Sequence, residues 1–151
     1  MTIFFYKVCE PYGCFSNFSP HSIQLGGKVW LTSEHYYQSQ KFVGTRDQPL
    51  CQKIYNAPSP EMAAAIGRNP IHSVRPDWDA VKTLIMYRAV LTKFVAYCDL
   101  TEILLSTGEQ MIIENSPTDV YWGCGSDGCG QNHLGKILMR IRQEIREGLT
   151  S

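Results

Sequence analysis

A glycine-rich stretch, Asp119–Gly135, constrains this chain more than any other segment. It reads Asp-Val-Tyr-Trp-Gly-Cys-Gly-Ser-Asp-Gly-Cys-Gly-Gln-Asn-His-Leu-Gly, with five glycines within thirteen residues. Glycine adopts positive φ at little cost and lets other groups approach bare backbone. The pattern predicts a short strand over Asp119–Gly123, an irregular loop, and a helix from about His133 to Glu147 with Asn132 as its N-cap.

Two interpretations of this stretch remain open at the level of sequence. A strand, a glycine loop and a helix start can direct several N–H groups and a helix dipole at an anion such as phosphate. Alternatively, the segment is a tight connection that needs glycine for its turns. A single glycine loop is a weak motif and does not separate the two.

A second informative segment, Thr32–Phe42, combines polar and aromatic residues. Thr32 or Ser33 can cap a helix, which places Glu34 in its first turn. Glu34, Gln38 and Lys41 then share one helix face, bordered by Tyr37. This arrangement suggests a lined pocket, and the alternative is a solvated face with an ordinary charged pair.

The turn-rich segment Glu10–Pro20 places Ser16 and Asn17 between Phe15 and Phe18. Such a loop could stack on a planar ligand and hydrogen-bond to it, or it could be a packed surface loop.

The rest of the chain predicts an α+β fold, a single compact domain over residues 1–151 that is mostly helical with short strands and a hairpin. Asp77 is expected to cap the longest helix, whose inward stripe includes Leu84 and Val95. The other expected elements are strands at Thr2–Tyr6 and Met111–Glu114, a hairpin of Ser22–Leu25 and Lys28–Leu31 around Gly26-Gly27, and helices at Asp47–Ala57 (capped by Asp47), from Ser59 to about Gly67, from Asp77 to about Cys98, and at Asp99–Ser106.

Charge and hydropathy limit the partners. Basic and acidic residues balance at 14 each, so no overall field draws the protein to nucleic acid or membrane, although the last helix is expected to carry Lys136, Arg140, Arg142 and Arg146 on its outer face. Met1–Tyr6 looks like a strand rather than a signal peptide, and no apolar run is long enough to span a membrane. We therefore expect a cytoplasmic protein.

The six cysteines are expected to be reduced. Cys9/Cys14 and Cys124/Cys129 share a C-x4-C spacing, and a zinc site built from both pairs is conceivable. Structural zinc sites usually have tighter spacings, so ordinary small residues beside glycine turns are the favoured interpretation, with no metal and no cofactor.

Four separated blocks together resemble the NADAR family of YbiA-like proteins. The match spans nearly the whole chain in the family's order, and only Cys124 and Cys129 occupy variable positions of the glycine loop. The blocks are Phe15-Ser16-Asn17-Phe18, Ser33-Glu34-His35-Tyr36-x-Gln38-x-x-Lys41-Phe42, Asp77-Trp78, and Asp119-x-x-Trp122-Gly123-x-Gly125-x-x-Gly128-x-Gly130-x-Asn132-x-Leu134-Gly135.

The resemblance implies N-glycosidase chemistry, the cleavage of a bond between an amine and the anomeric carbon of a ribose. One branch of the family acts on phosphoribosylated pyrimidine intermediates of riboflavin synthesis. Another removes ADP-ribose from the guanine amino group in nucleic acid, where an ADP-ribosyltransferase toxin is a conceivable partner that the sequence does not identify. The expected ligand is thus a phosphorylated ribosyl molecule or ADP-ribosylated guanine.

The resemblance also implicates particular residues. Glu34 is expected to act as general acid/base, and Asp119 to stabilise the cationic sugar or orient water, although these roles could be exchanged. Lys41 could bind phosphate, lower the pKa of Glu34, or attack the anomeric carbon as a neutral amine. The residues expected to bind substrate are Ser16, Asn17, Phe18, His35, Gln38, Trp78, Trp122, Gly123, Gly125, Asn132, Leu134 and Gly135.

Three rival functions remain. A module of the same fold could hold ADP-ribose-like ligands without cleaving them. The arginine-bearing last helix could bind nucleic acid, which would show as a steep salt dependence. A zinc-structured interaction domain is the third.

Overall fold

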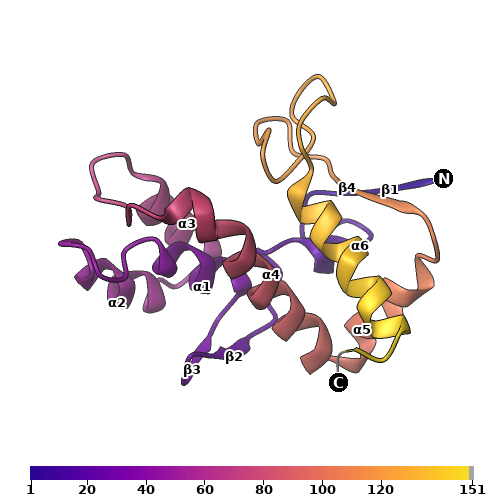
Figure 1. Cartoon of the computed structure of the whole chain (residues 1–151), viewed down its shortest axis with the longest axis horizontal. Coiled ribbons are helices and arrows are strands. Elements are labelled where there is room, and N and C mark those ends of the chain that lie inside the picture. Colours follow the sequence, from indigo (N-terminus) through magenta and orange to yellow (C-terminus); the bar gives the residue numbers. More distant parts are fainter. Residues whose placement is uncertain (150–151) are drawn as a thin grey trace. The chain divides into compact units, whose positions relative to one another are not determined.

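The computed structural model describes residues 1–149, which form six α-helices, one short 3-10 helix and four short strands (Figure 1). The chain divides into two units, and each is described separately. One unit comprises Pro20–Lys93, and the other joins Met1–Ser19 to the described chain from Phe94 onward.

The unit of residues 20–93 begins with a hairpin and continues with helices. In the hairpin, Gly26 and Gly27 have φ of 63° and 78°, as a tight two-residue turn requires, and Ile23 lies opposite Trp30. Its elements are β2 (Ile23–Leu25), β3 (Lys28–Trp30), α1 (Ser33–Gln40), α2 (Pro49–Tyr55), α3 (Pro60–Arg68) and most of α4 (Trp78–Ala96).

Two apolar groups hold this unit together. A cluster of Phe42, Ile54, Ala57 and Ala63 joins the end of α1 to α2 and α3, with Leu50, Cys51 and Ile66 packed around it. The ring of Trp30 lies edge-on to Tyr36 and Tyr55, with centroids 5.5 and 4.9 Å away. Trp30 thus joins the hairpin to both α1 and α2.

The other unit contains a pair of parallel strands, β1 (Thr2–Phe5) and β4 (Met111–Glu114), in which Ile3 lies beside Ile112. The amphipathic helix α6 (His133–Arg146) packs on β4 and on α5 (Cys98–Ser106), burying Leu134, Leu138 and Ile141. The 3-10 helix η1 (Gly13–Phe15) places the buried ring of Phe15 5.8 Å from that of Phe5 and 5.7 Å from that of Phe94.

Most predicted elements are confirmed within a few residues, and so is the α+β, mostly helical class. Two details of the helices were wrong. Gln48, not Asp47, precedes α2, because the Asp47 carboxylate instead accepts a hydrogen bond from the backbone of Ser73. On α4, Leu84 and Val95 are exposed, and the buried face carries Ile85, Met86, Ala89, Val90 and Phe94.

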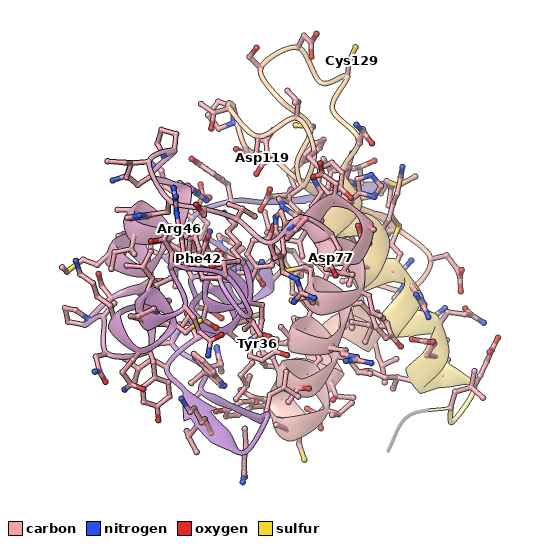
Figure 2. All side chains as sticks on the ribbon, turned by 60° about the vertical axis from the view of Figure 1, so that its left-hand side comes forward. Tyr36, Phe42, Arg46, Asp77, Asp119 and Cys129 are labelled. Atoms are coloured by element: carbon pink, nitrogen blue, oxygen red, sulfur yellow. The ribbon has the colours of Figure 1, made fainter. Side chains whose placement is uncertain are left out.

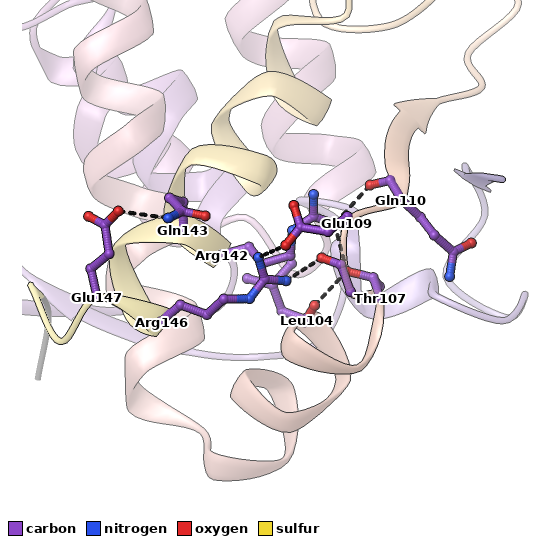
Figure 3. A network of polar contacts seen from close by, with 9 residues as sticks. Leu104, Thr107, Glu109, Gln110, Arg142, Gln143, Arg146 and Glu147 are labelled. Atoms are coloured by element: carbon purple, nitrogen blue, oxygen red, sulfur yellow. Dashed lines mark hydrogen bonds and ion pairs between the residues drawn. The ribbon is translucent and has the colours of Figure 1, made fainter.

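Arg142 is a further correction, because it is buried rather than on the outer face of α6. Its Nη1 donates to Thr107 Oγ1 at 2.9 Å and to the Gln110 carbonyl at 2.8 Å (Figure 3). Burial, and next the charge of Arg146, lower the pKa of Arg142, while Glu109 raises it. Arg142 therefore fastens α6 to the turn between α5 and β4.

No helix within residues 1–149 is both long enough and apolar enough to cross a membrane.

Candidate active site

The helix α1 is unusual because it is buried although most of its side chains are polar. Every residue from Ser33 to Ser39 is buried. The Thr32 hydroxyl caps the helix by accepting from the backbone N–H of His35 at 3.2 Å. Buried polar side chains are costly unless they are hydrogen-bonded or functional, which makes α1 the natural centre of a site.

Glu34 lies on this helix with its carboxylate buried. Its Oε2 accepts from the Gln38 side-chain amide at 2.7 Å, one helical turn away, as the i, i+4 spacing predicted. Arg68, in the last turn of α3, places its Nη2 3.8 Å from the same oxygen and is mostly exposed. A buried carboxylate is thus held between a neutral donor and a cation that can also reach solvent.

Lys41, at the end of α1, has an amine in a partly apolar setting. Its Nζ donates to the Gly67 carbonyl at 3.2 Å and lies 5.8 and 6.0 Å from the ring centroids of Tyr37 and Trp78. Desolvation lowers the pKa of Lys41 to about 8, against a smaller raising effect of Glu34. The positive charges of Arg68 and Lys82 lower the pKa of Lys41 further.

Trp78 is brought to this lysine by the segment that precedes α4. The backbone N–H of Arg75 donates to the Lys41 carbonyl at 2.8 Å, which ties the segment to the end of α1. Arg75 also clamps Asp77 through Nε and Nη2, at 2.6 and 2.9 Å, and Trp78 follows as the first residue of α4. The rings of Trp78 and Tyr37 lie 5.2 Å apart and form one wall beside the amine.

His35 has both ring nitrogens engaged by the protein. Nε2 contacts only the Ala57 carbonyl at 2.9 Å, so it carries the proton, and the Thr32 hydroxyl then donates to Nδ1 at 2.7 Å. Burial lowers the pKa of His35, against smaller raising effects of the Ala57 carbonyl and Glu61. A neutral imidazole therefore links the start of α1 to the end of α2.

The predicted strand at Asp119–Gly123 is wrong, because this segment is irregular. Asp119 Oδ1 accepts from the backbone N–H groups of Tyr121 and Trp122 at 3.0 and 2.8 Å. A side chain that bonds its own neighbouring backbone competes with strand pairing. Asp119 and Cys129 lie on the same loop, with Cys129 near its tip (Figure 2).

Three amides at the end of the glycine loop bond to carbonyls of the same segment, contrary to the interpretation in which the start of α6 faces an anion. The N–H groups of Asn132, His133 and Leu134 donate to the carbonyls of Gly123, Tyr121 and Trp122 at 3.0, 3.0 and 3.1 Å. The start of α6 is thereby saturated by the loop that leads into it, so these amides are not directed at a ligand.

Several of the glycines are explained by close packing. A Cβ on Gly123 would come within 2.8 Å of the Glu114 carbonyl, and one on Gly135 within 2.1 Å of the Ile112 carbonyl. Gly125 instead has φ of 70°, which glycine tolerates best. The second interpretation, a tight connection packed on β4, accounts for these positions.

Asn132 precedes α6 as predicted, but its side chain does not cap the helix. Its φ is 53°. Both polar atoms of its side-chain amide bond the backbone of β4: Oδ1 accepts from Glu114 N–H at 3.0 Å, and Nδ2 donates to the Ile112 carbonyl at 2.9 Å.

The remaining predicted residues lie in the same unit as this loop. Trp122 is half-buried, with its ring 4.8 Å from that of Tyr121, which stacks on His133 at 4.2 Å. Ser16 Oγ accepts from Phe18 N–H at 3.1 Å. Ser16 and Asn17 are buried, and Phe18 is half-buried. Leu134 is a core residue of α6.

The structure thus brings Glu34, Gln38, Lys41 and Trp78 together within one unit. It adds Gly67 and Arg68, which the sequence did not single out because their proximity to α1 depends on how α3 packs. Among residues 1–149, no group of three or more histidine, cysteine or acidic side chains is placed to hold a metal ion.

Comparison with known proteins identifies related chains. The NADAR domain family model matches residues 4–146, which covers parts of both units. An N-glycosidase of Nostoc punctiforme is 56% identical over 150 residues, 99% of this chain and 96% of that protein. A chloroplastic riboflavin biosynthesis protein of Zea mays is 47% identical over 95% of this chain but only 25% of its own length. The NMR structure of Escherichia coli YbiA matches with a TM-score of 0.88 at 38% identity, covering 99% of this chain and 88% of that one.

Proposed function

This chain belongs to the NADAR family, as its four sequence blocks indicated, and we propose that it hydrolyses the N-ribosidic bond between an amine and a phosphorylated ribose. The N-glycosidase class rests on the family and on a relative of nearly the same extent that is named for this activity. The finer substrate and the roles of individual residues are argued from the site.

One observation carries the proposal: a lysine amine with a pKa of about 8 lies in the same buried cluster as a glutamate. At pH 7.5, roughly a quarter of such amines are neutral. A neutral amine is a nucleophile toward an anomeric carbon, whereas an ordinary surface lysine is almost wholly charged. This favours covalent attack over phosphate binding as the role of Lys41.

The proposed reaction has two halves. In the first, the neutral Lys41 amine bonds to the anomeric carbon and the carbon–nitrogen bond of the substrate breaks. The Glu34 carboxylate takes one proton from the Lys41 nitrogen and gives it to the leaving amine. Ring opening then moves the remaining proton of that nitrogen to the ring oxygen and leaves an imine.

In the second half, the Glu34 carboxylate takes a proton from water as the hydroxide adds to the imine carbon, and it passes this proton to the Lys41 nitrogen. Collapse of this adduct frees the sugar aldehyde and leaves Lys41 as a neutral amine and Glu34 as a carboxylate. Trp78 and Tyr37 exclude water from the amine before substrate binds, which is consistent with their positions beside Nζ.

The other predicted roles rest on the family resemblance. Asp119 is proposed to stabilise the cationic sugar or orient water, and Trp122 and Phe18 to stack on the base. Since Asp119 Oδ1 already accepts two backbone N–H groups, its carboxylate also has the structural task of shaping the loop.

We favour a phosphoribosylamino-pyrimidine of riboflavin synthesis as the substrate. The support is the maize relative named for riboflavin biosynthesis, together with a second such relative in Vibrio vulnificus at 39% identity. ADP-ribose on the guanine amino group is the second candidate, since it offers the same bond between an exocyclic amine and a ribose.

Turnover of the two substrates tests the proposal. We expect the wild type to release free amine from the pyrimidine, and Glu34→Gln to lose about 10²- to 10⁴-fold in kcat. Glu61→Gln, an exposed carboxylate in the first turn of α3, is the matched control and retains activity. If only ADP-ribosylated guanine is cleaved, that molecule rather than the pyrimidine is the substrate. If both molecules bind and neither is cleaved, the chain is a ligand-binding module rather than an enzyme.

A further inference from the structure

Gly67 stands out because nothing in its own backbone requires glycine. It lies within α3, one residue before the helix ends, and is not among the residues with positive φ. Glycine inside a helix is less favourable than alanine, because it loses more conformational freedom on folding. Its presence at this buried position therefore needs a reason outside the helix.

That reason is the Gln38 side chain, which occupies the space where a Cβ would stand. A Cβ built on Gly67 would lie 2.0 Å from Gln38 Oε1, 2.7 Å from its Cδ and 2.9 Å from its Cβ. Gln38 is 1% exposed, and its Nε2 is held by Glu34 at 2.7 Å. The side chain therefore cannot move away without disturbing that hydrogen bond.

The Gln38 carbonyl oxygen is also the one buried side-chain nitrogen or oxygen in residues 1–149 without a hydrogen-bond partner. Leaving a buried acceptor unsatisfied is unfavourable, so the orientation of this amide has to be imposed by its other contacts. The donated bond to Glu34 and the close fit against Gly67 impose it.

The same glycine also contacts the lysine of the site. Lys41 Nζ donates to the Gly67 carbonyl at 3.2 Å. Gly67 thus contacts two polar side chains of the site. Gln38 fills the space where a Gly67 side chain would lie, and Lys41 donates to the Gly67 carbonyl.

We propose that Gly67 is a positioning residue that fixes the Gln38–Glu34 hydrogen bond and the Lys41 amine in one arrangement, with Gln38 as the part through which it acts on Glu34. This proposal rests on the proposed function for its effect on turnover. Its effect on the geometry of Lys41 and Gln38 is separate, and can be measured without substrate.

The test is Gly67→Ala, examined by two measurements. On the pyrimidine substrate we expect kcat to fall by at least about tenfold with little change in KM, because small displacements of reacting groups are costly. In the substrate-free protein, the Lys41 titration midpoint, followed by NMR of ¹³C-labelled lysine and assigned with Lys41→Arg, should move away from about 8. A merely structural helix position would not change this midpoint.

A double-mutant cycle with Gln38→Ala shows whether Gly67 acts on Glu34 through the Gln38 side chain. Gln38→Ala removes the contacts with Oε1 at 2.0 Å and Cδ at 2.7 Å and leaves only the Cβ contact of 2.9 Å. Gly67→Ala in the Gln38→Ala background should therefore fold and should add little further loss. This keeps the test valid if Gly67→Ala alone does not fold. Ala65→Gly, on the exposed side of the same helix, controls for a change in helix propensity and should leave kcat and the Lys41 midpoint unchanged.

The outcomes separate the two proposals. If Gly67→Ala leaves both the Lys41 midpoint and kcat as in the wild type, or if its effect is undiminished in the Gln38→Ala background, the positioning role of Gly67 is overturned. If the Lys41 midpoint moves but kcat does not, the positioning role stands, and the catalytic role of Lys41 in the proposed function fails.

Discussion

The chemistry assigned to Lys41 depends on the surroundings of a single amine. Burial is the largest cause of its lowered pKa, and Arg68 and Lys82 add to that effect, while Glu34 opposes it. The amine thus becomes neutral near pH 8, well below the usual range for lysine. Protonation of one residue should therefore be visible in the pH dependence of the reaction.

We predict that kcat/KM rises with pH and levels off above about 8, the pKa of Lys41. The direction follows because the neutral amine, which is the nucleophile, accumulates as pH rises through that value. Steady-state rates from pH 6 to 9.5 measure this. A rate that falls as pH passes through about 8 would instead indicate that the charged ammonium binds a phosphate.

His35 predicts a second pH dependence, in stability. Its pKa is lowered mainly by burial, so between that lowered value and 6.5 the unfolded state binds more protons than the folded state. The free energy of unfolding should therefore fall as pH is lowered through 6.5. Urea unfolding at pH 7.5 and 5.5 should show a smaller fall in His35→Gln than in the wild type, and an equal fall in both would contradict this prediction.

At the scale of elements, the attachment of α6 to the rest of its unit depends on polar side chains as well as on its apolar face. Asn132 joins the start of the helix to β4, and Arg142 joins its middle to the turn after α5 (Figure 3). Both side chains bond groups more than fifteen residues away in sequence. Each can be tested against a nearby control.

Asn132 combines two hydrogen bonds with a left-handed backbone, and two substitutions separate these contributions. Asn132→Gly keeps the backbone accessible and loses only the bonds to β4, at about 1–3 kcal/mol. Asn132→Ala loses the same bonds but keeps a Cβ at φ of 53°, so it should be less stable than Asn132→Gly by about 1 kcal/mol. Denaturant unfolding of the two variants measures the difference. Equal stability of both would contradict the backbone contribution.

Arg142 and Arg140 lie two residues apart on α6 but differ in surroundings. Arg142→Ala leaves Thr107 Oγ1 and the Gln110 carbonyl without their donor, and we expect a loss of about 2–3 kcal/mol. Arg140 pairs with Glu144 at the surface, so Arg140→Ala should cost less than about 1 kcal/mol. Chemical denaturation compares them, and a smaller loss for Arg142→Ala than for Arg140→Ala would refute the anchoring role.

At the scale of the whole molecule, a single family model covers residues 4–146, which include segments of both units. The sequence predicted the elements well because local signals determine them: Gly26-Gly27 for the hairpin, Ser59-Pro60 for α3, and the apolar stripe of α6. It also placed Glu34 and Gln38 on one face of a helix, where residues four apart are neighbours, and the structure shows a hydrogen bond between them.

What the sequence did not predict depends on contacts between distant segments. Gly67 was interpreted as a helix-ending glycine, whereas its role depends on the packing of α3 against α1. The amides before α6 were a candidate anion site, but the loop carbonyls that bond them are determined by the fold of the loop as a whole. The charge of Arg142 predicted a place on the outer face of α6. The side chain is instead buried, because it bonds Thr107 and the Gln110 carbonyl, which lie outside α6.

Reductive trapping is the measurement that tests the central claim most directly. The wild-type protein is incubated with the phosphoribosylamino-pyrimidine and with borohydride, and its peptides are analysed by mass spectrometry. We predict a reduced ribose-phosphate adduct on the peptide containing Lys41, absent in Lys41→Arg and still formed in Lys53→Arg, a substitution at an exposed lysine of α2. Release of free amine by Lys41→Arg at the wild-type rate, without any adduct in the wild type, would contradict the account.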